Sequence, residues 1–96
     1  MLTANGWNVM QYAVLTHMFA QVSGLEVGEF VHVIADAHIY DRHVPIVEEI
    51  ISRKPFEAPK LWLDPAVTDF YGFTTDSLKL EGYQCHELDV KIPVAV

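Results

Sequence analysis

Residues His32–Tyr40 read HVIADAHIY, an alternation of polar and apolar side chains. Successive strand residues point to opposite faces of a sheet, so this alternation predicts a β-strand from Phe30 to Tyr40. One face of the strand would carry His32, Asp36, His38 and Tyr40, and the other Val31, Val33, Ala35, Ala37 and Ile39. A face rich in imidazole, carboxylate and phenol groups offers the donors and acceptors that binding sites use.

The segments around this strand predict an α+β fold. A helix is expected from about Gly6 to Val22, and it is apolar around most of its circumference, which is typical of a buried helix. Asn5 is a candidate N-cap and Gly24 a candidate stop signal. A short helix and two short strands are expected over Val44–Ser52, Lys60–Leu63 and Ser77–Glu81. The predicted fold is therefore a long buried helix followed by a sheet strand, a short helix and short strands.

Length and composition bound the domain organisation. The chain has 96 residues, which is enough for one domain at most, and we assign residues 1–96 to it. Hydrophobic residues make up 51% of the chain, and the mean hydropathy of +0.19 is high for a small independent domain. We therefore expect part of the apolar surface to meet another chain.

Charge and cysteine content argue against several classes of protein. The formal net charge is −7 and the first Lys or Arg is Arg42, so a nucleic-acid-binding surface is not expected. Cys85 is the only cysteine, which excludes an internal disulfide and is typical of a reducing, cytoplasmic setting. No basic region precedes the first apolar segment, and polar residues interrupt that segment, so neither a signal peptide nor a membrane span is expected.

The polar face of the predicted strand leaves two alternatives open. His32, Asp36 and His38, with His43 nearby, resemble a two-histidine, one-carboxylate metal set. His32 and Asp36 would lie roughly 13 Å apart at ~3.3 Å per strand residue, too far for one ion without a bend. A His/Asp metal-binding domain is therefore disfavoured. The other alternative is a non-catalytic assembly module that dimerises through its apolar sheet.

Four ordered motifs resemble the thymidylate synthase family, folate-dependent enzymes that methylate dUMP. The first is NGWNVMQY at residues 5–12, in which an Asn opens the long helix, and the second joins LEVGEF at 25–30 to DAHIY at 36–40. The others are FEAPKL at 56–61 and the ending PVAV at 93–96. The resemblance covers essentially the whole chain but only the C-terminal third of the family. It implies that family's fold and a homodimer whose subunits pack sheet against sheet.

The resemblance implies three residues that bind the substrate dUMP. Asn8 would hydrogen-bond the uracil ring, because a carboxamide supplies a donor and an acceptor together. His38 and Tyr40 would hydrogen-bond the deoxyribose 3′-hydroxyl.

The resemblance also implies a site for the co-substrate 5,10-methylenetetrahydrofolate. Ala4 and Trp7 would lie beside the folate, with the Trp7 ring as a stacking surface. Ala95 and the carboxylate of Val96 would belong to a tail that closes over both ligands and excludes water. Ala4 and Ala35 depart from the family, in which glycine is common at both positions.

Two parts of the family's catalytic machinery have no counterpart in these motifs. The family attacks uracil with a cysteine and holds phosphate with arginines, and both lie before the matched block. Cys85 does not match the nucleophile motif, and a neighbouring His86 in sequence does not give the spatial pairing that activates a thiol. We therefore expect no catalytic residue here. The parent enzyme would convert dUMP to dTMP with release of dihydrofolate, whereas the isolated chain would be inactive.

Overall fold

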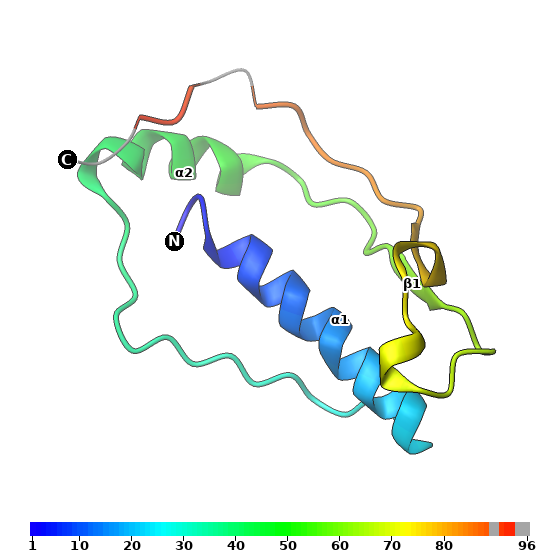
Figure 1. Ribbon diagram of the computed structural model, residues 1–96. Coiled ribbons are helices and arrows are strands. Elements are labelled where there is room, and N and C mark those ends of the chain that lie inside the picture. The colour runs from blue at the N-terminus through cyan, green and yellow to red at the C-terminus, as the bar shows by residue number, and fades with distance from the viewer. Residues whose placement is uncertain (89–90, 94–96) are drawn as a thin grey trace.

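One long helix near the N-terminus lies in the middle of the molecule, and the rest of the chain runs around it as an open ring (Figure 1). The computed structural model describes residues 1–88 and 91–93. In chain order the elements are α1 (Asn5–Ser23), the 3-10 helix η1 (Asp41–His43), α2 (Val44–Ser52), β1 (Lys60–Leu63), the 3-10 helices η2 (Phe70–Gly72) and η3 (Thr75–Ser77), and β2 (Leu78–Glu81). These elements confirm the predicted α+β class.

Helix α1 extends the predicted helix by one residue at each end. Gly24 ends it in the left-handed conformation, with φ of 69°, and its backbone N–H meets the carbonyls of Ala20 and Gln21. The prediction that Asn5 is the N-cap is wrong: Ala4 occupies that position, and Asn5 is the first helical residue. The side chain of Asn5 turns instead to a residue 27 positions away.

We expect Gly24→Ala to lower the free energy of unfolding by about 1 kcal/mol, because a Cβ is strained at positive φ. Gly6→Ala is the matched control, since Gly6 lies inside α1 and an added Cβ would meet no atom within 4 Å. It should raise the same free energy by about 0.5–1 kcal/mol through helix propensity. Urea unfolding followed by circular dichroism measures both variants, and changes of the same sign would contradict this account.

The two short strands form an antiparallel hairpin, and β1 has the predicted residues. Lys60 pairs with Glu81 and Leu63 with Leu78. Strand β2 begins one residue later than predicted, because Ser77 closes η3: its Oγ accepts a hydrogen bond from the backbone N–H of Thr74 at 3.0 Å. The predictions of both strands and of α2 are therefore confirmed, the latter to the residue.

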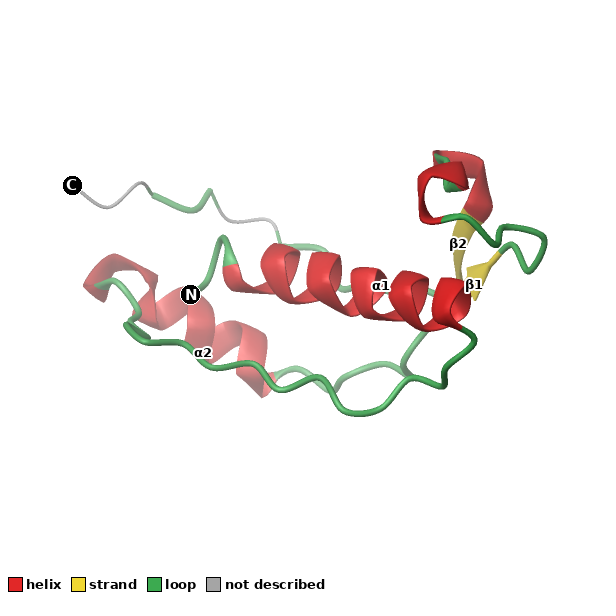
Figure 2. Ribbon diagram, turned by 60° about the horizontal axis from the view of Figure 1, so that its bottom comes forward, coloured by secondary structure: helices red, strands yellow, loops and turns green. Residues whose placement is uncertain are grey.

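The hairpin region docks on the C-terminal end of α1. Gln21 donates through Nε2 to the carbonyl oxygens of Asp64 (2.8 Å) and Val67 (3.0 Å). The rings of Phe19 and Phe70 stack with their centroids 4.9 Å apart. The hairpin thus lies at one end of α1, and the opposite end, with residues 1–8, stays free of it (Figure 2).

The predicted strand from Phe30 to Tyr40 is not formed. This segment pairs with no other strand among the described residues, and Ala35 and Asp36 form a turn that interrupts the alternation. A strand needs a neighbouring strand to satisfy its N–H and C=O groups, and the hairpin lies elsewhere. The segment instead runs past the first residues of α1.

Burial of α1 is the second difference from the sequence-based expectation. None of its side chains is buried. Among the described residues only Ile46, Ser77 and His43 are buried, so the apolar core amounts to Ile46. The radius of gyration is 16.6 Å, against about 12–13 Å for a compact domain of this length. The apolar circumference of α1 therefore requires a cover that these residues do not supply.

No helix in the described part of the chain is long and apolar enough to cross a membrane.

Candidate functional site

A groove of about 360 Å³, lined by both apolar and polar side chains, lies between the start of α1 and the segment at residues 32–36. Asn5 and Asn8 of α1, with Met1 and Ala4 just before the helix, form one wall, and residues 32–36 form the wall opposite. Asn8 is exposed here, and its carboxamide bonds to no other described residue. The groove thus presents a free donor and acceptor side by side.

The two walls of the groove are joined by His32. Its Nε2 donates to Asn5 Oδ1 at 3.1 Å, and its ring stacks on Phe30 with centroids 5.9 Å apart. The N-terminal ammonium group of Met1 adds a bond to the carbonyl of His38 at 3.3 Å. These contacts hold the segment against α1 without any strand pairing.

Beyond the turn at Asp36, three aromatic rings follow one another. His38 donates through Nδ1 to the backbone carbonyl of Asp36 at 2.9 Å, which leaves Nε2 as an acceptor when the imidazole is neutral. The His38 and Tyr40 rings meet edge to face at 5.2 Å, and Tyr40 meets His43 in the same way at 5.4 Å. The predicted pair His38 and Tyr40 is thus brought together.

The proposed folate residues are divided between two places. Ala4 lines the groove at the start of α1, together with Asn8. Trp7 is 80% exposed and lines a separate apolar groove of about 430 Å³ along α1, with Met10, Val14 and Met18. Ala95 and Val96 lie outside the described residues.

Cys85 carries an exposed free thiol. It raises the pKa of the Tyr83 hydroxyl, first through a side-chain hydrogen bond and then because a thiolate nearby disfavours the phenolate. Both groups lie on the segment after β2, away from the groove at α1.

In the described part of the chain no three His, Cys, Asp or Glu side chains gather into a set that could hold a metal ion, so the alternative of a metal site at His32, Asp36 and His38 finds no support.

Sequence reasoning missed the roles of two histidines. His32 bridges the groove to Asn5. His43 is buried and bonds to a residue 50 positions away. Neither contact leaves a signal in the sequence, since each depends on how distant segments meet.

The fold of this chain is α+β, and the groove brings the start of α1 against residues 32–36. Comparison with known proteins identifies its family: the thymidylate synthase family model matches residues 1–96. The chain is 49% identical over 92 residues to the thymidylate synthase of Clostridium beijerinckii, covering 94% of this chain and 35% of that protein. It is also 49% identical over 84 residues to the Bacillus mojavensis enzyme, covering 88% of this chain and 30% of that protein.

A solved structure agrees with these relatives. The thermostable thymidylate synthase A from Bacillus subtilis matches with a TM-score of 0.90 and 43% identity, over 95% of this chain and 33% of that one. The chain belongs to the thymidylate synthase family, as its motifs predicted. It spans about a third of the length of the relatives it matches.

Proposed function

We propose that residues 1–96 are a single domain, the C-terminal third of a thymidylate synthase, and that they build part of its nucleoside pocket. The observation that carries this proposal is the groove in which Asn8 faces residues 32–36, followed along the chain by the paired rings of His38 and Tyr40. In a member of this family, these groups suit the pyrimidine and the sugar of dUMP.

The chemistry of Asn8, His38 and Tyr40 supports the roles that we propose for them. The carboxamide of Asn8 donates to a carbonyl oxygen and accepts from the imide N–H of uracil. His38, whose Nδ1–H is engaged with Asp36, offers Nε2 to a hydroxyl proton. The Tyr40 hydroxyl can donate to the same oxygen. A 3′-hydroxyl would then be held from two sides.

The co-substrate 5,10-methylenetetrahydrofolate is proposed to lie near Ala4 and Trp7, beneath the tail with Ala95 and Val96. Trp7 offers an exposed indole face for stacking. The whole enzyme would transfer the one-carbon unit to dUMP and give dTMP and dihydrofolate. This chain would contribute binding and exclusion of water, and the nucleophile and phosphate clamp would come from other residues.

A homodimer is proposed as the assembled form, in the cytoplasm. Its support is the amount of apolar surface left uncovered, including Phe19, Val31 and Val33, the last of which is 84% exposed. The same surface favours the second candidate function, a dimerising module without catalysis. Nucleotide binding separates the two candidates, because a pure assembly module has no use for Asn8, His38 and Tyr40.

Tyr40→Phe tests the assignment of the sugar contact. The variant is made in a chimera in which residues 1–96 replace the matched third of Bacillus subtilis thymidylate synthase A. We expect dUMP to bind about 2–10-fold more weakly, the cost of one hydrogen bond of about 0.5–1.5 kcal/mol. Binding of 2′,3′-dideoxyuridine monophosphate, which lacks the hydroxyl, should be unchanged.

Tyr71→Phe is the matched control, because Tyr71 is 92% exposed on η2, at the other end of α1. Titration calorimetry with both nucleotides measures all four affinities. If Tyr40→Phe weakens both nucleotides equally, Tyr40 does not contact the 3′-hydroxyl.

A further inference from the structure

The most buried side chain among the described residues is a histidine to which the proposed function gives no task. His43 is 4% exposed, less than Ile46 at 9%. Burial of an imidazole is unfavourable unless its polar atoms find partners. Its position in a chain with so small a core therefore calls for an explanation in terms of what it contacts.

One partner of His43 comes from the end of the described chain. The His43 Nε2 lies 2.7 Å from the carbonyl oxygen of Pro93. A carbonyl only accepts, so Nε2 carries the proton and donates. Proline has no N–H, so this carbonyl is the backbone group through which Pro93 can be held. The bond ties residues 91–93 to the start of α2.

The second partner is Tyr40, which the proposed function places at the sugar. The His43 ring meets the Tyr40 ring edge to face, with centroids 5.4 Å apart and planes at 77°. The His43 backbone N–H also donates to the Tyr40 carbonyl at 2.8 Å. The His38 ring also meets it edge to face at 5.2 Å, so the Tyr40 ring contacts two imidazoles, and these contacts restrict its rotation.

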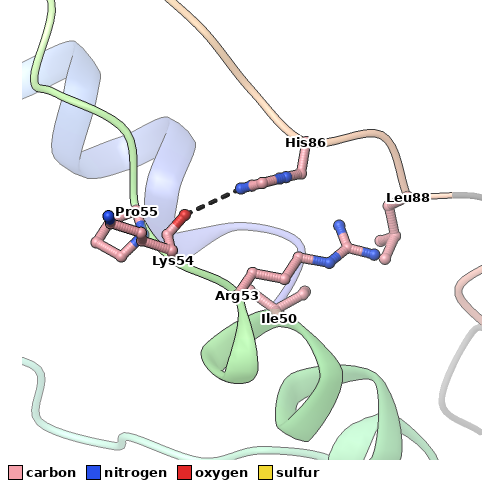
Figure 3. Close-up of a pocket in the computed structure, with 6 residues that line it drawn as sticks. All are labelled: Ile50, Arg53, Lys54, Pro55, His86 and Leu88. Atoms are coloured by element: carbon pink, nitrogen blue, oxygen red, sulfur yellow. Dashed lines mark hydrogen bonds between the residues drawn. The ribbon is translucent and has the colours of Figure 1, made fainter.

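Residues 86 and 87, which precede Pro93 in the chain, are held just after the end of α2. Arg53 donates through Nη1 to the carbonyl of Glu87 at 2.9 Å, and His86 donates through Nε2 to the carbonyl of Lys54 at 3.0 Å (Figure 3). The His86 ring also stacks on Phe56 at 4.4 Å. Because these contacts fix residues 86 and 87 independently, loss of the His43 bond should release the Pro93 end alone.

We propose that His43 is a positioning residue: anchored by the Pro93 carbonyl, it fixes the ring of Tyr40 in the orientation that the sugar contact needs. The link between His43, Tyr40 and Pro93 stands without any ligand, and its effect on dUMP rests on the proposed function. His43 itself touches neither nucleotide nor folate in this proposal.

Two substitutions separate the anchor from the ring. His43→Phe keeps an aromatic ring and removes the donor, whereas His43→Gln keeps a donor near the position of Nε2. His43→Asn, whose shorter amide does not reach the Pro93 carbonyl, repeats the first test with a polar side chain if the phenylalanine variant does not fold. His17→Leu, an exposed histidine on α1, is the control.

The first measurement needs no ligand. The backbone order parameters of Lys91 and Ile92 are measured by ¹⁵N relaxation in the purified protein. We expect them to fall below about 0.6 in His43→Phe and to keep the value of the unsubstituted protein in His43→Gln and His17→Leu. Equal order parameters in His43→Phe and the unsubstituted protein overturn the anchor, whatever the protein binds.

The second measurement is a double-mutant cycle in the chimera. His43→Phe should weaken dUMP about fivefold and leave 2′,3′-dideoxyuridine monophosphate unchanged, an effect that general loosening of the fold would not produce. In the Tyr40→Phe background the same substitution should have no further effect, because His43 acts through the Tyr40 hydroxyl. Additive losses overturn the proposal. Absence of any Tyr40→Phe effect would instead overturn the proposed function and leave the order parameters of Lys91 and Ile92 to decide on the anchor.

Discussion

Residues 1–96 alone should release no tritium from 5-tritiated dUMP, whereas the chimera with Bacillus subtilis thymidylate synthase A should release it at least about 1000-fold faster than background. The physical reason is the chemistry that the chain offers. The groove at α1 presents amide, imidazole and phenol groups, which bind and orient. Loss of a nucleophile alone can cost roughly 10⁶-fold in turnover.

Cys85 provides the control for this first prediction. Its thiol is exposed and lies after β2, beside Tyr83 rather than beside Asn8. The chimera with Cys85→Ser should therefore keep its tritium release within about twofold. Release by the isolated chain, abolished by the same substitution, would show that Cys85 attacks the pyrimidine and that our assignment is wrong.

Asn8→Ala in the chimera should lower kcat/KM for dUMP by about 100-fold. Two hydrogen bonds to the uracil edge would be lost, and the polar atoms of the pyrimidine would be buried without partners. Together these effects amount to about 2–4 kcal/mol. Steady-state kinetics with varied dUMP measures the change, and the KM for the folate should move far less.

Gln84→Ala is the matched control for Asn8. It removes the same carboxamide group from a separate cavity lined by residues of the hairpin, including Lys60 and Glu81. We expect kcat/KM within about twofold of the unsubstituted chimera. A similar loss in both variants would indicate that Asn8→Ala acts through stability rather than through uracil.

Local patterns predicted the local structure well. Helix α2 and both strands follow from helical spacing, alternation and flanking prolines, and Gly24 ends α1 because few other residues accept its positive φ. The prediction of a strand at Phe30–Tyr40 was wrong for a physical reason. Alternation indicates which side chains would lie on opposite faces of a strand, but a strand forms only when a neighbouring strand pairs with its backbone. The prediction that α1 is buried was wrong for a similar reason, since an apolar helix is buried only when other residues pack around it.

The candidate site was predictable in part, and mainly through family motifs. Periodicity on an ideal strand put His38 and Tyr40 on one face, and their rings do meet. Asn8 and Ala4 share a groove, although nothing in the spacing of the residues required it. The bonds of His32 to Asn5 and of His43 to Pro93 span 27 and 50 residues. Contacts at such separation depend on tertiary packing, which local sequence patterns do not encode.

The uncovered circumference of α1 has a consequence for how the stability of this chain should be understood. When most apolar side chains find their partners outside the chain, the folded state is populated by mass action. The free energy of unfolding then rises with the logarithm of the concentration of the partner that covers the helix. The exposed side chains of Trp7, Met10 and Phe19 then contribute both to association and to the stability of the fold. A melting temperature of this protein is therefore meaningful only together with the concentration at which it was measured.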